Sequence, residues 1–423
     1  LTVKWMLDAE QGPGINRYFW ETRPWADGGA FYFFPLGGEL RLCRPPEATG
    51  GLLAEEMGLG KTIETLALTL LNPRPQTQLT VQHQQQVQKL CTRATLIIAP
   101  KALIGQWCAE LHRYAKDLAI ITYDAGDENA SKVHSRHVRR TAGRDHQGCA
   151  VGEKVETLAF AGSDRWVPAT ITRVYKRPDS VLYDLRITIT AEFLCDHDFV
   201  FTSYPTLKIA TGNTVLQCLK KISWWRICLD ECQMVREATT NLAKSCTDLA
   251  SVHRWMISGT PLTTSINDLN GELQFLRVWP FSLSDKDDGF WEHRIGNAWA
   301  SRDPAALDLL NPLLSTVMIR HSKSQRHLDG SKLTSLPANS IQWQGLPLGK
   351  GSAAYLYLWI EAFVASELTR RVQSGWGRGV LDQLNADDKR CFHKLRALMT
   401  MLRRACTDTK TIELPVLDDA IRK

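Results

Sequence analysis

Short apolar runs bounded by turn residues alternate along the chain with segments of helical spacing, a pattern typical of buried strands and the helices that cover them. The strands are expected at Gly51–Ala54, Thr95–Ala99, Phe199–Phe201, Arg226–Leu229 and Trp255–Ile257. Apolar strands that alternate with helices form parallel sheets covered on both faces. We therefore predict an α/β fold.

Two stretches interrupt this alternation. Residues 72–93 are polar and rich in glutamine, and we interpret them as a surface excursion rather than an element of the sheet. Residues 127–196 include a segment at about 151–190 in which apolar and polar residues alternate around Gly, Pro and Asp turns. That spacing predicts a small β-barrel inserted into the α/β chain.

The last part of the chain has a different pattern. After about Ser331 no further strand–turn–helix unit follows, and long helical patterns occupy Ala353–Val372 and Asp387–Cys406. The sequence thus predicts one α/β lobe in two parts, at 1–126 and 197–330, with the insertion at 127–196 between them and a helical connector at 331–423.

The turn after the first predicted strand has the features of a phosphate site, in GGLLAEEMGLGKTIETLALTLL. Glycines let backbone N–H groups curl around phosphate oxygens, a lysine reaches the β- and γ-phosphates, and a hydroxyl can hold Mg²⁺. The strict pattern has glycine where Glu55 stands, and the alternative is a glycine turn with a surface lysine. The nucleotide-binding candidates are Gly58, Leu59, Gly60, Lys61 and Thr62.

Paired carboxylates follow a later strand, in SWWRICLDECQMV. Asp230 and Glu231 come at the carboxyl end of a predicted parallel strand, where α/β folds bind ligands. One carboxylate can hold Mg²⁺ through water, and the other can orient or deprotonate an attacking water. Such a pair alone is usually a solvated strand end, but downstream of a phosphate turn it predicts an ATPase pair.

A third strand–turn–helix unit reads RWMISGTPLTTSINDL. The hydroxyls of Ser258 and Thr260, around Gly259, can hydrogen-bond Asp230 and Gln233 and report the nucleotide state to another surface. Helix-capping hydroxyls in an ordinary turn have the same pattern, so this unit has two interpretations.

Charge, cysteine content and hydrophobicity indicate what kind of partner and compartment to expect. Basic residues number 51 against 45 acidic ones, a net charge of +6 that suits a polyanionic partner. The eleven cysteines include no C-x-x-C pair, which favours reduced thiols of the cytosol or nucleus over disulfides or a zinc site. No apolar run approaches the roughly 18 residues that span a bilayer, and the start lacks a basic-then-apolar leader, so we expect no membrane segment and no secretory signal.

Taken in order, these segments resemble the Swi/Snf-type DNA-dependent ATPases of helicase superfamily 2. MGLGKT is similar to the family's motif I, LIIAPKALIGQWCAEL to motif Ia, DFVFTSYPTL to motif Ib, LDECQ to motif II and ISGTPLTTSINDL to motif III. The family usually carries an acid where Glu55 stands. VKWMLDAE, DECQ, VMIRHSKSQ and LRALMTMLRRAC are most similar to the SHPRH-like postreplication-repair branch, which bears RING ubiquitin-ligase insertions.

The resemblance implies a RecA-like P-loop NTPase lobe that uses ATP and Mg²⁺. In a full-length relative it would couple hydrolysis to translocation on double-stranded DNA or chromatin in the nucleus. The residues so implied are Lys61, Asp230 and Glu231 for catalysis, Thr62 and Asp230 for Mg²⁺ (partly through water), and Gln233, Ser258, Gly259 and Thr260 for coupling to DNA.

DNA contacts implied by the resemblance lie on loops and helix starts at the sheet edge. The candidates are Lys101, Gln106, Thr202, Ser203 and Tyr204. The competing interpretation is a packed turn at Tyr204 and a solvated charge at Lys101. A basic run holding Arg139, Arg140 and Arg144 could add non-specific affinity, though such runs are usually solvated faces or linkers.

The insertion looks similar to Tudor-type or related SH3-like barrels. Phe160, Trp166, Tyr175 and Tyr183 could form an aromatic cage for a methylated lysine or arginine of a histone or other peptide. The same aromatics could instead be the core of a barrel too small to fold without bulky side chains, and this second interpretation is favoured.

A second RecA-like lobe, with its arginine fingers, is expected after a segment such as Leu395–Cys406, and the sequence stops at Lys423. We therefore expect weak turnover by this chain alone. The alternative function is a nucleotide-gated scaffold or truncated lobe for chromatin or ubiquitin-pathway partners, against which the intact Lys61 and Glu231 argue. An unrelated P-loop NTPase, such as a kinase, fits the phosphate turn but gives no account of SGTP.

Overall fold

The computed structural model describes residues 1–26, 28–75, 89–115, 117–124, 132–135, 138–140, 149–158, 166–177, 180–187, 189–208, 214–262, 265–282, 289–326, 330–331, 342, 352–373, 393 and 396–403. The chain divides into two compact units, Leu1–Ser335 and Leu336–Lys423. The candidate site residues all belong to the first unit.

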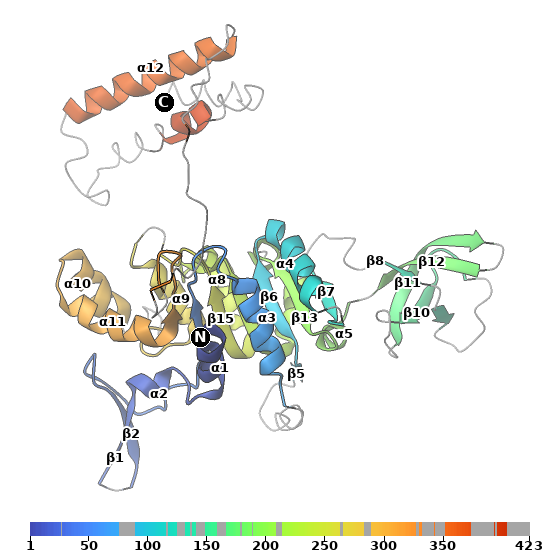
Figure 1. The fold of residues 1–423 in the computed structure, drawn as a ribbon, viewed down its shortest axis with the longest axis horizontal. Helices are drawn as coiled ribbons and strands as arrows, with labels where there is room; N and C mark the ends of the chain where they lie inside the picture. Colours follow the sequence, from blue (N-terminus) through green and yellow to red (C-terminus); the bar gives the residue numbers. More distant parts are fainter. Residues whose placement is uncertain are drawn as a thin grey trace. The chain divides into compact units, whose positions relative to one another are not determined.

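A parallel sheet forms the centre of the first unit (Figure 1). Its strands run in the order β16-β4-β15-β14-β6-β13-β7, with β5 also pairing with β14, and the pairs are parallel. The five predicted strands lie in β4, β6, β13, β14 and β15, which confirms the α/β class. The strand bounds are β4 (Thr49–Leu53), β5 (Leu90–Cys91), β6 (Thr95–Ala99), β7 (Ile120–Thr122), β13 (Phe199–Ser203), β14 (Ile222–Asp230), β15 (Ala250–Ile257) and β16 (Met318–Ile319).

Helices cover both faces of the sheet. Alternate residues of each strand point to opposite faces, so a strand contributes side chains to two apolar clusters. In β6, Ile97 and Ala99 belong to one apolar cluster, and Leu96 and Ile98 belong to the other. The first cluster packs under α1 (Thr2–Gln11), α3 (Lys61–Leu71) and α4 (Lys101–Tyr114). The second packs under α5 (Ala191–Cys195), α6 (Tyr204–Lys208), α7 (Thr214–Lys220), α8 (Asn241–Asp248), α9 (Asp268–Leu276) and α11 (Ala305–Val317).

The inserted segment forms its own antiparallel sheet, in the order β8-β12-β11-β10-β9. Its strands are β8 (Lys132–Ser135), β9 (Val138–Arg140), β10 (Lys154–Leu158), β11 (Trp166–Arg177) and β12 (Ser180–Ile187). Two of these strands precede residue 151, so the sheet is larger than the predicted barrel segment. Tyr183 is buried in the sheet's apolar core, whereas Tyr175 is exposed and its hydroxyl donates to Asp184. The aromatic cage stays a prediction, and Phe160 and Arg144 lie outside the described residues.

An N-terminal addition has no counterpart in the sequence prediction. After α2 (Asn16–Phe19), the strands β1 (Glu21–Pro24), β2 (Ala30–Phe34) and β3 (Glu39–Arg41) form a small antiparallel sheet.

The structure also corrects one expectation nearby in the chain. The glutamine-rich stretch at 72–93 ends in β5, which pairs with β14, because Leu90 and Cys91 continue the parallel hydrogen bonding of the main sheet. Residues 76–88 of that stretch lie outside the described residues.

In the second unit, α12 (Ser352–Gln373) corresponds to the helix predicted at Ala353–Val372. Residues 396–403 are helical within the second predicted helix, and Ile360, Val364, Leu398 and Met401 form a small apolar core.

Short additional elements of the first unit are a 3₁₀ turn (Cys232–Val235), a π-helical turn (Glu292–Gly296) and α10 (Asn297–Ala300). Among the described residues, no helix has both the length and the apolar character needed to cross a membrane.

A buried ion pair fastens α1 to the middle of the sheet. Both side chains are fully buried, and Arg226 on β14 donates from Nε and Nη2 to the two oxygens of Glu10, at 2.6 and 2.5 Å. The Trp255 indole N–H donates to the same carboxylate at 2.8 Å. Burial raises the pKa of Glu10, but the charge and hydrogen bonds of Arg226 outweigh it and leave the pKa below its usual value.

His253 lies near this pair and makes folding sensitive to pH. Its Nδ1 is 2.6 Å from the Thr49 hydroxyl, and among the described residues its Nε2 has no hydrogen-bond partner. Burial lowers the pKa of His253 from 6.5 to about 4. In the folded protein the ring therefore stays neutral between these values, while the unfolded chain takes up a proton, and stability is lost as the pH falls through this window.

We expect His253 to contribute a loss of about 1.4 kcal/mol in the free energy of unfolding per pH unit between roughly pH 6 and pH 4.5. Urea unfolding, followed by tryptophan fluorescence, measures this slope. In His253→Gln, which cannot titrate, the slope should be smaller by that amount. Equal pH slopes in the two proteins would show that His253 does not carry the effect.

Candidate nucleotide site

The phosphate turn lies between β4 and α3 and has the backbone expected of its glycines. Gly58 and Gly60 have φ values of 85° and 101°, in the left-handed region that glycine adopts without strain. Lys61 is the first residue of α3, and its Nζ points back over the turn and donates to the carbonyls of Glu55 at 2.9 Å and Glu56 at 3.4 Å. Thr62 follows at the second position of the helix.

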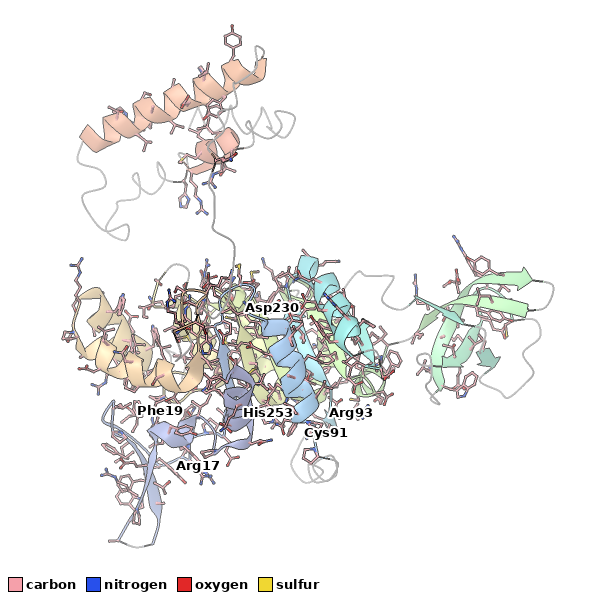
Figure 2. All side chains as sticks on the ribbon, viewed as in Figure 1. Arg17, Phe19, Cys91, Arg93, Asp230 and His253 are labelled. Carbon is pink, nitrogen blue, oxygen red and sulfur yellow. The ribbon has the colours of Figure 1, made fainter. Side chains whose placement is uncertain are left out.

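The acid pair lies within electrostatic reach of this lysine. Burial lowers the pKa of Lys61, while the charges of Asp230 and Glu231 act in the opposite direction. The Lys61 charge in turn lowers the pKa of Asp230, although burial has the larger influence and raises it overall. The strand registers agree with this placement, because Leu53 at the end of β4 and Asp230 at the end of β14 both lie opposite Ile257 of β15. Figure 2 shows Asp230 at the opposite edge of the sheet from Cys91 and Arg93, which precede β6.

Two aromatic residues from other elements fix Asp230 at the end of β14. The Trp107 indole N–H on α4 donates to Asp230 Oδ2 at 2.7 Å, and the Tyr204 hydroxyl donates to the Asp230 backbone carbonyl at 2.6 Å. Asp230 is only 7% exposed. Sequence reasoning did not identify Trp107, since an indole on an amphipathic helix has the pattern of an ordinary core residue.

A chain of hydrogen bonds joins the acid pair to the turn after β15. Glu231 has a φ of 54°, which is uncommon for a residue other than glycine. Gln233 Nε2 donates to Glu231 Oε2 at 2.6 Å, the Ser258 hydroxyl donates to Gln233 Oε1 at 2.9 Å, and the Thr260 amide donates to the Ser258 oxygen at 3.0 Å. Glu231 and the 258–260 turn are thus joined by one continuous chain of hydrogen bonds.

A segment near the end of the first unit, which the sequence does not assign to the site, also contacts the phosphate turn. We call Met318–Lys323 the strap, because its strand β16 pairs with β4 and its following residues cross the turn. Glu55, which replaces the expected glycine, is buried and accepts hydrogen bonds from the His321 amide at 2.8 Å and the Thr2 hydroxyl at 3.0 Å. Arg320 Nη1 donates to the carbonyls of Ala54 and Gly259, at 3.2 and 3.3 Å. The acid at this position thus has a structural role in anchoring the turn.

Three of the predicted DNA contacts are buried in the structure. Thr202, Ser203 and Tyr204 are at most 1% exposed. Ser203 Oγ donates to Asp124 at 2.6 Å, and the Tyr204 hydroxyl donates to the backbone carbonyl of Asp230. The hydroxyls of Ser203 and Tyr204 thus hold the end of β13 against its neighbours, and contact of this segment with DNA stays a prediction.

The two other predicted DNA contacts lie on the surface of α4. The Lys101 ammonium is exposed and 3.5 Å from Asp124 Oδ2. Gln106 is also exposed, and its amide donates to Glu110 at 3.2 Å. Both side chains are accessible, and their contact with DNA stays a prediction.

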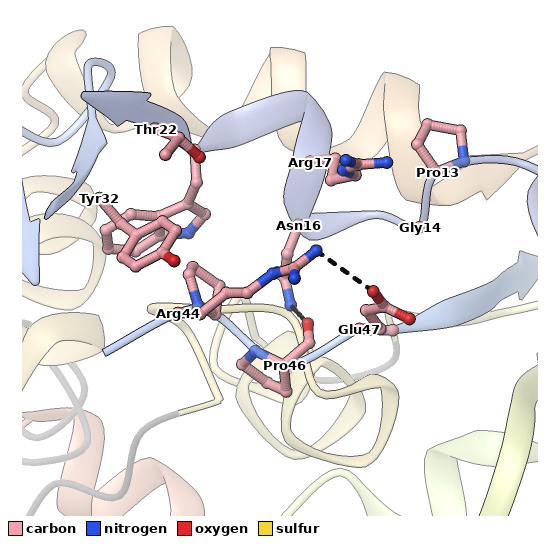
Figure 3. Close-up of a pocket in the computed structure, with 12 residues that line it drawn as sticks. Pro13, Gly14, Asn16, Arg17, Thr22, Tyr32, Arg44, Pro46 and Glu47 are labelled. Carbon is pink, nitrogen blue, oxygen red and sulfur yellow. Dashed lines mark hydrogen bonds and ion pairs between the residues drawn. The ribbon is translucent and has the colours of Figure 1, made fainter. Parts of the chain in front are cut away.

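A pocket of about 270 Å³ lies apart from these groups, and none of its lining residues belongs to the phosphate turn or the acid pair (Figure 3). Its walls come from α2, the β1–β2 hairpin and the segment before β4. Asn16 donates to the Pro46 carbonyl at 2.7 Å, and Arg44 pairs with Glu47 at 3.3 Å across it.

Comparison with known proteins identifies the family. The SNF2-related domain matches residues 1–410. DNA repair protein RAD5B of Arabidopsis thaliana is 26% identical over 366 residues, which are 80% of this chain and 24% of the relative. DNA repair protein rad8 of Schizosaccharomyces pombe is 25% identical over 411 residues, 93% of this chain and 30% of the relative.

The chain therefore spans less than a third of the length of these relatives. A solved structure of the Sulfolobus solfataricus SWI2/SNF2 ATPase core in complex with double-stranded DNA is similar, with 17% identity and a TM-score of 0.40, covering 84% of this chain and 53% of that one. Because the family match extends over nearly the whole sequence, this chain belongs to the SNF2-related domain family.

Proposed function

We propose that this chain binds Mg²⁺-ATP between the phosphate turn and the acid pair and hydrolyses it. The observation that carries the proposal is geometric: Leu53 at the end of β4 and Asp230 at the end of β14 both lie opposite Ile257 of β15, so the phosphate turn and the acid pair leave the same edge of the sheet. The charges of Asp230 and Glu231 act on Lys61 there. Lys61 would bind the β- and γ-phosphates. Glu231, held by Gln233, would orient and deprotonate the attacking water.

The donor chemistry around the turn suits magnesium. The ion prefers oxygen ligands and usually keeps several waters while bound to phosphates and one or two carboxylates. Thr62 and Asp230 supply a hydroxyl and a carboxylate, and the Trp107 hydrogen bond fixes the orientation of the carboxylate. Bound there, the ion would neutralise charge that develops on the phosphates.

In a full-length context we propose that hydrolysis drives translocation along double-stranded DNA in nuclear DNA repair, in the branch that includes the RAD5-type relatives. The net charge of +6 and the exposed Lys101 and Gln106 on α4 support a DNA contact. Gln233, Ser258 and Thr260 would connect that surface to the acid pair.

The experiment is phosphate release by the purified chain, with and without a double-stranded DNA of about 40 base pairs. We expect slow hydrolysis that the DNA stimulates at least about threefold, with the stimulation falling as salt rises, since phosphate contacts release counterions. ATP binding without any DNA-dependent hydrolysis would instead favour a nucleotide-gated scaffold.

A further inference from the structure

A second lysine lies over the phosphate turn. A Cβ placed on Gly58 would lie 3.8 Å from Lys323 Nζ at the end of the strap. In the described part of the chain this ammonium has no ion pair with a carboxylate. Its side chain is partly exposed, so its charge is available to a ligand at the turn.

The position of Lys323 is fixed by the backbone of the strap. The Ala54 amide donates to the Ile319 carbonyl at 2.9 Å, and the Glu56 amide donates to the His321 carbonyl at 3.1 Å. The Lys323 amide donates to Glu56 Oε2 at 2.7 Å. Glu56 therefore binds the backbone of Lys323 and leaves its ammonium free to point toward Gly58.

The charge balance of the site calls for a second cation. The charges of three nearby carboxylates act on Lys61, namely those of Asp230, Glu231 and Glu55. ATP brings further negative charge, which Mg²⁺ only partly neutralises. Arg320 is hydrogen-bonded to the carbonyls of Ala54 and Gly259, which leaves Lys323 as the cation of the strap that faces the turn.

We propose that Lys323 is a second phosphate-binding residue, which contacts the polyphosphate of ATP from the Gly58 side of the turn. This inference rests on the proposed nucleotide site and adds to it a residue 262 positions beyond Lys61 in the sequence. It also gives the strap a function, because a displacement of β16 relative to β4 would withdraw the ammonium and weaken nucleotide binding.

The test measures displacement of fluorescent N-methylanthraniloyl-ATP from the 423-residue chain by ATP, ADP and AMP in the presence of Mg²⁺. Lys323→Met keeps the aliphatic stem and removes the charge. We expect it to weaken ATP about tenfold, the effect of losing one charge-assisted hydrogen bond, and to change AMP less than about twofold. Lys323→Arg, which restores the charge, should bind ATP within about threefold of the unsubstituted chain.

Lys244→Ala, an exposed lysine on α8, is the matched control and should bind ATP normally. If Lys323→Met binds ATP as tightly as the unsubstituted chain, or weakens ATP and AMP equally, the assignment of Lys323 is overturned while the nucleotide site stands. If the unsubstituted chain itself fails to bind ATP, or Lys61→Ala binds it normally, the nucleotide site fails and the inference fails with it.

Discussion

Replacing Glu231 with glutamine is expected to slow ATP hydrolysis by about 10²–10⁴-fold while ATP affinity stays within about threefold. Glutamine has nearly the same shape, and its amide oxygen can still accept the Gln233 hydrogen bond now made at 2.6 Å. It cannot take a proton from water. The substitution therefore removes proton transfer and leaves the phosphate turn and Asp230 in place.

Single-turnover hydrolysis of γ-labelled ATP, with the chain in excess, measures this effect even when turnover is slow. Glu237→Gln is a matched control, because Glu237 is exposed and lies six residues further along the same segment. The control should hydrolyse ATP at the original rate. Hydrolysis by Glu231→Gln within threefold of that rate would exclude Glu231 as the general base.

Lys61→Ala is expected to weaken ATP binding by about 100-fold, equivalent to about 2.7 kcal/mol, because it removes the ammonium that would meet the β- and γ-phosphates. The same ammonium now donates to the carbonyls of Glu55 and Glu56. The free energy of unfolding should also fall slightly, by about 1 kcal/mol, because these two hydrogen bonds are lost.

Isothermal titration with ATP and Mg²⁺ gives the affinity, and a thermal melt of the same preparation separates loss of binding from unfolding. A folded Lys61→Ala chain with unchanged ATP affinity would mean that the turn is only a helix start with a surface lysine. The sequence leaves that alternative open, because Glu55 stands where the strict pattern has glycine.

The sequence predicted the parts of the fold and site whose causes are local. Buried strands such as β6 and β14 are continuous apolar runs, because both faces of the sheet are covered. The phosphate turn is recognisable because glycine backbone freedom and the lysine that follows it are adjacent in the chain. Asp230 and Glu231 are recognisable as candidates because two carboxylates directly follow an apolar strand.

The contacts that shape the site could not be predicted, since they join residues far apart in the chain. Trp107 reaches Asp230 across 123 positions, and His321 reaches Glu55 across 266. The Tyr204 hydroxyl donates to the Asp230 backbone carbonyl across 26 positions, a contact that no local pattern reveals. The strands β5 and β16 have two residues each, too few for a periodic signal.

The N-terminal sheet was missed for a related reason. All four residues of β1 are exposed, and β2 is only partly buried, so neither strand shows the apolar pattern that marks a buried element. The antiparallel insertion was noticed because its alternation is regular. Its first two strands were not, because three or four residues cannot establish a period.

The measurement that bears most directly on the account is a crystal structure of the chain with Mg²⁺ and a non-hydrolysable ATP analogue. We expect the triphosphate along Gly58–Thr62 and one Mg²⁺ between the Thr62 hydroxyl and the Asp230 carboxylate. Nucleotide bound elsewhere on the chain, or an ion that Asp230 does not reach directly or through water, would contradict the proposed site.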